Sequence, residues 1–189
     1  MFKTGIIIFF GIHLVPLISK LRFYLKDNLG ESLYMSLYSL VALAGLVLII
    51  LGYESSSNFL FSINANAYLY KEYLMFVSFV LLIAASMPTY IKKITRHPMS
   101  YGMIVWASLH LLVNPDLSSV ILFGSFLAYS IISVLIAELR TEETNKALNP
   151  TNTLASPKVT FDVLSIILAV FFTSLAFHFH EYFTGVNLV

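Results

Sequence analysis

Long apolar stretches without aspartate, glutamate, lysine or arginine alternate with short charged segments along this chain. Six such stretches occupy residues 4–19, 32–53, 73–91, 97–115, 117–137 and 163–180. A helix needs about 20 apolar residues to cross the hydrocarbon core of a bilayer, with a range of about 17–25. The pattern therefore predicts an all-α integral membrane protein, built as a bundle of six transmembrane helices.

Prolines, asparagines and charges mark where these helices are expected to bend or end. Pro16 lies inside the first stretch, where a proline kinks a helix, and the segment that follows is expected to be a charged loop. Asn114-Pro115-Asp116 is a turn signal between the fourth and fifth stretches. Residues 54–72 are polar and long enough for a short interfacial segment, and residues 141–160 predict a long irregular linker.

Lysine and arginine are distributed unequally between alternate loops. Nine of them follow the first, third and fifth helices, and two lie on the opposite side. The nine are Lys20, Arg22, Lys26, Lys92, Lys93, Arg96, Arg140, Lys146 and Lys158, and the two are Lys3 and Lys71. Because positive residues are enriched in cytoplasmic loops, loops 1, 3 and 5 are expected to be cytoplasmic and both termini to lie outside. The expected location is the cell inner (plasma) membrane.

The composition supports this class and narrows the chemistry. The 189 residues are 58% hydrophobic and 11% charged, whereas soluble domains carry about 25% charged residues. A net charge of +1 gives no argument for binding nucleic acid, and the absence of cysteine excludes disulfides, cysteine-ligated zinc and iron–sulfur clusters. The length suits one domain, residues 1–189, and no small-residue cleavage site of a signal peptide follows the first apolar run.

Histidines inside the apolar stretches are the first candidates for function. Polar groups within a bilayer are costly and usually face the bundle interior or a cavity. His13 lies in the first stretch, three residues before Pro16. In the fourth stretch, Met103, Trp106, His110 and Asn114 recur at helical spacing and are expected to form one stripe that lines an internal site.

The remaining histidines lie closer to the predicted interfaces. Arg96-His97-Pro98 fits the start of a helix, with the arginine at a lipid headgroup. His97 precedes His110 by 13 residues, roughly 20 Å along a straight helix, so the two cannot share a small metal site. His178 and His180 are about 200° apart around a helix at about 100° per residue, so at most one is expected to face inward.

Two buried imidazoles in a helical bundle suggest two kinds of chemistry. One is ligation of a b-type haem by two axial histidines, because bundle interiors are common cofactor sites. The other is a proton relay. Asn114, one turn after His110, is expected to orient the second ring nitrogen of that histidine, as partners of ligand histidines commonly do.

Several segments resemble the NnrU family of six-helix membrane proteins, whose plant relative is 15-cis-zeta-carotene isomerase. The matching pieces are "FFGIHLVP" at 9–16, "LR" at 21–22, "LGESLYMSLYSLVAL" at 29–43, "GY" at 52–53, "RHPMSYGMIVWASLHLLVNPDLSSVILFGSFL" at 96–127, and His180 followed by Gly185-Val186. The RHP-to-LFG block is the most specific of these. Pro115 departs from the glycine that the family usually has in this turn.

The resemblance implies haem chemistry and two functional settings. Bacterial members are linked to denitrification, in the handling of nitrite and nitric oxide by their reductases. The plant relative is a haem b enzyme that isomerises a cis double bond of a lipophilic polyene. The resemblance implies His13 and His110 as axial ligands, with His180 as a further candidate. Arg96 and His97 are then structural or receive a haem propionate, and Trp106 and Asn114 border the cofactor.

Two alternatives remain open from the sequence. "RHPMSYG" with Glu142-Glu143 about 40 residues later also resembles membrane methyltransferases that bind S-adenosylmethionine at the cytoplasmic face, although such a glutamate pair is often just a solvated charge cluster. The third reading is a non-enzymatic haem carrier or assembly factor for a partner reductase. The sequence therefore leaves open whether the protein is an enzyme, and which lipophilic substrate or partner it has.

Overall fold

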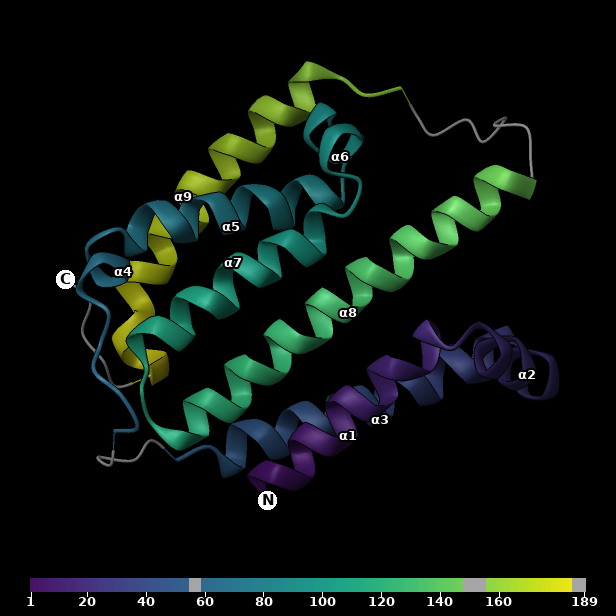
Figure 1. The fold of residues 1–189 in the computed structure, drawn as a ribbon, viewed down its shortest axis with the longest axis horizontal. Coiled ribbons are helices and arrows are strands. Elements are labelled where there is room, and N and C mark those ends of the chain that lie inside the picture. Colours follow the sequence, from purple (N-terminus) through teal and green to yellow (C-terminus); the bar gives the residue numbers. More distant parts are fainter. Residues whose placement is uncertain (55–58, 148–155, 185–189) are drawn as a thin grey trace. The chain divides into compact units, whose positions relative to one another are not determined.

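The computed structural model describes residues 1–54, 59–147 and 156–184, apart from the side chains of 141–147, 183 and 184. Glu142-Glu143 and Gly185-Val186 therefore lie outside the described side chains. The elements are α1 (Phe2–Leu14), the 3₁₀ turn η1 (Val15–Leu17), α2 (Ser19–Leu29), α3 (Glu31–Gly52), α4 (Ala65–Leu69), α5 (Lys71–Ala85), α6 (Tyr90–Thr95), α7 (Pro98–Val113), α8 (Leu117–Ala147) and α9 (Val159–Thr184) (Figure 1). The all-α prediction is confirmed for these residues.

Several of these helices are long and apolar enough to cross a membrane. Glu31–Gly52, Leu117–Arg140 and Val159–Tyr182 qualify singly, and Phe2–Leu17 with Ser19–Leu29 qualifies as a pair bent by 93°. Six spans are not confirmed. The two missing ones are α5 and α7, whose 15 and 16 residues extend only about 22–24 Å.

Prolines explain why α5 and α7 are short. The third apolar stretch continues beyond Ala85, but α5 ends there, three residues before Pro88. The next helix, α6, begins after Thr89, whose side chain accepts a hydrogen bond from Lys92 N at 3.0 Å. Helix α7 has Pro98 at its first position and ends at Val113. Asn114, which precedes Pro115, has a φ of −121° and a ψ of 90°, outside the helical region that a following proline disfavours.

Two segments that the sequence predicts as loops are helical. The segment after the first stretch forms α2, which follows the break at Val15–Leu17, so the kink predicted at Pro16 is a full change of direction. Helix α8 continues to Ala147, seven residues into the predicted linker 141–160. In both places the helix runs through charged residues, among them lysine, arginine and glutamate, that have high helix propensity. The described part of the segment 54–72 contains one short helix, α4, and its expected interfacial position stays a prediction.

The described chain divides into two compact units. The first comprises Met1–Leu60 and Asp116–Ser125, and the second comprises Phe61–Pro115 and Phe126–Val189. In the first unit α1 packs along α3. Glycines bring the two backbones close: a Cβ added to Gly45 would lie 2.7 Å from Phe9 N, and one added to Gly5 would lie 2.6 Å from Ile49 N. Small residues permit such close helix packing in lipid.

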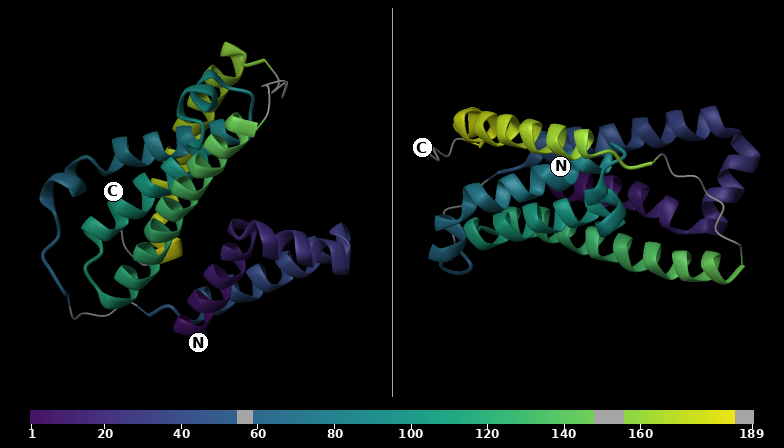
Figure 2. Two further views of the ribbon diagram at one scale, coloured as in Figure 1. Left: turned by 45° about the vertical axis from the view of Figure 1, so that its right-hand side comes forward. Right: turned by 90° about the horizontal axis from the view of Figure 1, so that it is seen from above.

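In the second unit α5 packs against both α7 and α9 (Figure 2). Gly102 of α7 allows the close approach, because a Cβ there would lie only 3.0 Å from Ser78 O of α5. The Gly102 carbonyl accepts a 2.9 Å hydrogen bond from Ser78 Oγ. Met75, Leu109 and Ala67 form the buried core, with Trp106 and Phe177 packed around it. Helix α4 is joined to the end of α7 by a hydrogen bond from Asn64 N to Leu112 O at 3.0 Å. This arrangement gathers the ends of α5, α7 and α9 around one cavity.

Candidate functional site

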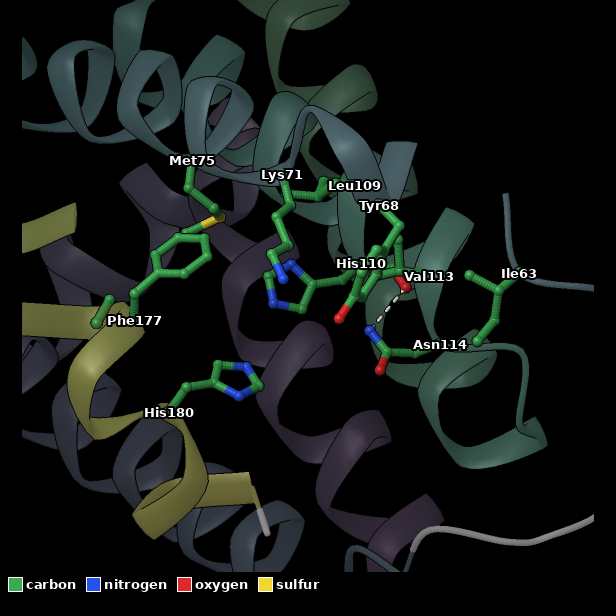
Figure 3. Close-up of a pocket in the computed structure, with 11 residues that line it drawn as sticks. Ile63, Tyr68, Lys71, Met75, Leu109, His110, Val113, Asn114, Phe177 and His180 are labelled. Atoms are coloured by element: carbon green, nitrogen blue, oxygen red, sulfur yellow. Dashed lines mark hydrogen bonds between the residues drawn. The ribbon is translucent and has the colours of Figure 1, made fainter. Parts of the chain in front are cut away.

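A cavity of about 150 Å³ lies within the second unit. Its walls are mostly apolar and aromatic side chains, among them Met75, Leu109, Val113 and Phe177. Four strongly polar residues also line it: Lys71, His110, Asn114 and His180 (Figure 3). A largely apolar pocket with a few convergent polar groups is the usual form of a small-molecule or cofactor site.

His110 is held in a fixed orientation on α7. Its Nδ1 donates a hydrogen bond to the carbonyl oxygen of Trp106 at 2.8 Å, and its ring packs against the Trp106 indole with centroids 4.8 Å apart. Since a carbonyl can only accept, Nδ1 carries the proton and Nε2 carries the lone pair when the ring is neutral. This is the tautomer that a histidine needs to bind a metal through Nε2.

His180 of α9 faces His110 from the other side of the cavity (Figure 3). His178, two residues earlier, is exposed and its ring packs on Phe179 at 4.9 Å between centroids. The prediction that at most one of these two histidines faces inward is confirmed. Two imidazoles from different helices thus share one apolar pocket.

His13 in the first unit has the same local geometry as His110. Its Nδ1 donates to the carbonyl oxygen of Phe9 at 2.6 Å, four residues earlier on α1. The ring packs on Phe9 at 4.3 Å and lies edge-on to Tyr38 of α3 at 5.6 Å between centroids. His13 and His110 belong to different units, so the predicted ligand pair stays a prediction.

Arg96 and His97 form a separate charged cluster with Glu138 of α8. Arg96 Nη1 donates to Glu138 Oε2 at 3.3 Å, and His97 Nε2 lies 3.4 Å from Glu138 Oε1 without the geometry of a hydrogen bond. Arg96 has a φ of 59°, which is strained for a residue with a side chain. Arg96, Tyr101 and Glu138 line an open depression that is distinct from the histidine pocket.

Comparison with known families matches this chain over nearly its whole length. A model of the family described as NnrU protein matches residues 1–188. The chain belongs to the NnrU family. Comparisons with curated proteins and with solved structures gave no match.

In this NnrU-family protein the predicted site residues fall into three places. His110, Asn114 and His180 line one pocket, and the Trp106 ring packs against the His110 ring. His13 lies in the first unit, and Arg96 and His97 lie at the Glu138 cluster. Met103 of the predicted stripe does not line the pocket. The predicted role of Asn114 also differs: its Nδ2 donates to the backbone carbonyl of His110 at 2.9 Å, while the Trp106 carbonyl orients the ring.

Sequence reasoning missed Lys71, Tyr68 and Glu138. Lys71 enters the sequence analysis only in the orientation of the loops, although a lysine two residues before an apolar stretch is a candidate in its own right. Glu138 lies one residue beyond the predicted end of the fifth apolar stretch, and it is helical because α8 continues to Ala147. Nothing in the sequence indicates that Glu138, 42 residues after Arg96, contacts that arginine.

Among the described residues, no three histidine, cysteine, aspartate or glutamate side chains are grouped to hold a metal ion. A bare zinc site needs three or four protein ligands. Haem brings four porphyrin nitrogens of its own, so one or two histidines complete its iron. The ligand set of the pocket therefore fits haem better than a bare ion. The cavity volume of about 150 Å³ is below the roughly 300–1,000 Å³ of typical ligand pockets, so a haem would extend beyond it or displace its wall.

Proposed function

We propose that this NnrU-family protein binds haem b in the pocket of its second unit, with His110 and His180 as the iron ligands. The observation that carries the proposal is the pair of imidazoles facing each other across one apolar pocket. The hydrogen bond from His110 Nδ1 to Trp106 O supports it, because it presents Nε2 as the lone-pair nitrogen. The proposal treats residues 1–189 as one functional domain.

The residues of the pocket would have two different roles in binding haem. His110 and His180 would hold the iron through their ring nitrogens, and the apolar walls would exclude water from the cofactor. Phe177 and Met75 belong to the wall that a porphyrin would press against, and both lie on helices that pack with α5 or form it. When bound, haem would supply a redox-active iron that can transfer an electron or bind a small molecule.

His13 is the alternative second ligand that the family resemblance implies. Its Nδ1 hydrogen bond to Phe9 O gives it the same lone-pair nitrogen as His110. The two ligand assignments predict different behaviour of single variants, so they can be separated in one series.

The experiment is a pyridine haemochromogen assay on detergent-purified full-length protein from haem-replete cells. We expect about one haem per chain in the wild type and a loss of at least tenfold in His110→Ala. His13→Ala should keep its haem, and His178→Ala, an exposed histidine of α9, is the matched control. A colourless wild type, or full haem in His110→Ala, would overturn the proposal.

We further propose that the protein is a multi-pass component of the inner membrane, with six spans and with loops 1, 3 and 5 in the cytoplasm. The distribution of lysine and arginine supports the orientation. In this arrangement α5 and α7 are short spans that cross a locally thinned bilayer, which costs only a modest free energy.

The family resemblance supports two settings for a bound haem: nitrite and nitric oxide metabolism, or isomerisation of a lipophilic polyene. A carrier or assembly factor for a partner reductase would use the same histidines. An enzyme needs a substrate cavity beside the iron, and a carrier needs an accessible haem edge. Apomyoglobin, which takes up haem, distinguishes a carrier from an enzyme when it is added to the haem-loaded protein. We expect a carrier to lose its haem to apomyoglobin within minutes and an enzyme to retain it.

The second candidate function is S-adenosylmethionine-dependent methyl transfer. Its support is that Arg96 and Glu138 line an open depression and that Glu138 also lies near His97, so a carboxylate is brought to the RHP segment. Equilibrium dialysis with labelled S-adenosylmethionine tests it. Binding that is lost in Arg96→Ala and retained in His110→Ala supports the methyltransferase, and no binding to the wild type excludes it.

A further inference from the structure

Helix α2 turns across the end of the pair formed by α1 and α3 in the first unit (Figure 1). Ile18, with a φ of −98° and a ψ of 93°, ends the helical run after η1, and the direction of the chain changes by 93°. At the other end of α2, Gly30 has a φ of 78°, a value that favours glycine, and α3 starts at the next residue. Because α1 packs along α3, a membrane that these two helices cross has α2 along its surface.

Helix α2 exposes more apolar surface than a connection in water needs. None of its residues is buried. Leu21, Leu25 and Leu29 recur at intervals of four and form one stripe along the helix, and Leu21 and Leu29 are exposed. Tyr24, which is 65% exposed, lies beside the stripe, and Phe23 is 69% exposed on the other side. Aromatic rings are common at the level of the lipid headgroups, so this surface suits the boundary between headgroups and acyl chains.

The charged residues of α2 lie outside the leucine stripe. Lys26 pairs with Glu31 of α3, with Nζ 2.5 Å from Oε1, and so ties α2 to the next helix. Lys20 and Arg22 are exposed in the first turn of α2, which contains no acidic residue. A positive charge in the first turn opposes the helix dipole, so these two cations do not stabilise α2 itself. Asp27, the acidic residue of α2, lies in its second half. The start of α2 therefore favours a partner that brings negative charge.

We propose that α2 is an interfacial helix that binds anionic phospholipids. Its leucine stripe lies at the acyl-chain boundary, and Lys20 and Arg22 contact the headgroup phosphates, which their long side chains can reach. The distribution of lysine and arginine predicts that this end of α1 and α3 is cytoplasmic, so the lipids are those of the cytoplasmic leaflet. The inference rests on the membrane spans proposed above and is independent of haem.

Spin labels on single cysteines measure where α2 lies, because the chain has no cysteine of its own. Full-length protein is reconstituted into symmetric vesicles of phosphatidylcholine and phosphatidylglycerol. Each label is tested with oxygen, which concentrates in lipid, and with a nickel chelate, which stays in water. We expect labels at Leu21 and Leu25 to favour oxygen, and a label at Asp27, on the opposite side of the helix, to favour nickel. Equal preference for nickel at all three would place α2 in water, and equal preference for oxygen would place it in the hydrocarbon. Either result would overturn the proposal.

The role of the two cations is measured with lipids that carry a nitroxide quencher on an acyl chain. A fluorophore on Tyr24→Cys reports how strongly phosphatidylglycerol and phosphatidylcholine quench it. One lysine or arginine at an anionic surface contributes about a fivefold preference. With the native Lys20 and Arg22 we therefore expect phosphatidylglycerol to be preferred at least about fivefold, and the double variant Lys20→Gln, Arg22→Gln to lose this preference. The double variant Lys20→Arg, Arg22→Lys keeps both charges and should keep it. Lys93→Gln, at an exposed lysine of α6, is the matched control and should also keep it.

The results separate this inference from the proposed haem site and from the orientation of the loops. Equal quenching by the two lipids when Lys20 and Arg22 are native would overturn the role of the cations. Loss of the preference in the charge-preserving variant would also overturn it, because the residues would then act on the fold. Symmetric vesicles present the same lipids on both faces, so neither measurement depends on which side is cytoplasmic. A colourless protein would still give both measurements, so failure of the haem proposal is distinguishable from failure of this one.

Discussion

At the scale of single residues, a few backbone hydrogen bonds decide what the histidines can do. His13 and His110 each donate Nδ1 to the carbonyl four residues earlier, and both are thereby prepared to bind through Nε2. The sequence predicted both histidines as candidates, but assigned the orientation of His110 to Asn114. The Asn114 Nδ2 donates instead to His110 O, the same carbonyl that accepts a hydrogen bond from the Asn114 backbone N at 2.9 Å.

Asn114→Ala tests this division of roles. Since the Trp106 carbonyl orients the imidazole, we expect the variant to keep its haem content within twofold of the wild type. Loss of the 2.9 Å hydrogen bond to His110 O should lower stability by about 1 kcal/mol. Haem quantitation and a thermal melt in detergent measure the two effects. A partner that holds a ligand ring typically costs 10–100-fold in metal affinity when removed, and a haem loss of that size would contradict our account.

At the scale of elements, charged and proline residues set most helix boundaries correctly. The stretch 32–53 predicts α3 to within one residue at each end, and 97–115 predicts α7 to within two. Charge-free windows cannot reveal α2 or the last turns of α8, because these helices continue through polar residues with high helix propensity. In the first unit Gly45 and Gly52 of α3, seven residues apart, both lie close to the backbone of α1: an added Cβ at Gly45 would lie 2.7 Å from Phe9 N, and one at Gly52 would lie closer still to Phe2 N.

Gly45→Ala tests the packing of α1 on α3. Its added methyl group would lie 2.7 Å from Phe9 N, and a rigid backbone cannot yield as a side chain can. We expect a loss of about 1–3 kcal/mol, measured as a lower melting temperature in detergent. Gly11→Ala on α1 is the matched control, since nothing lies within 4 Å of its added methyl group. There alanine should be neutral or stabilising by up to about 1 kcal/mol. Equal melting temperatures for the two variants would refute the close approach.

At the scale of the whole molecule, the sequence predicted the membrane class, the helical fold and the family, whose profile matches residues 1–188. It could not predict the pocket, because the convergence of His110, His180 and Lys71 depends on how α5 packs between α7 and α9. Spacing along one helix excludes pairs such as His97 and His110, but says nothing about pairs on different helices.

The number of spans can be measured directly, because the chain contains no cysteine. Single cysteines at Ser62 and Ser156 mark the predicted outer and inner sides, and one at the exposed Ser86, between α5 and α6, reports whether α5 crosses. A membrane-impermeant maleimide on intact spheroplasts should label Ser62→Cys and spare Ser156→Cys and Ser86→Cys. Labelling of Ser86→Cys together with Ser62→Cys would show that α5 and α7 do not cross, and six spans would be wrong.

The central claim, that His110 and His180 hold haem in the pocket of the second unit, is tested most directly by the absorption spectrum of His180→Ala. Purified protein is recorded oxidised and dithionite-reduced beside His178→Ala, which lies two residues away and is exposed. We predict that His178→Ala keeps the reduced b-type α and β bands of the wild type, and that His180→Ala loses them or changes to a five-coordinate spectrum. An unchanged spectrum in His180→Ala would contradict this assignment and return the second ligand position to His13.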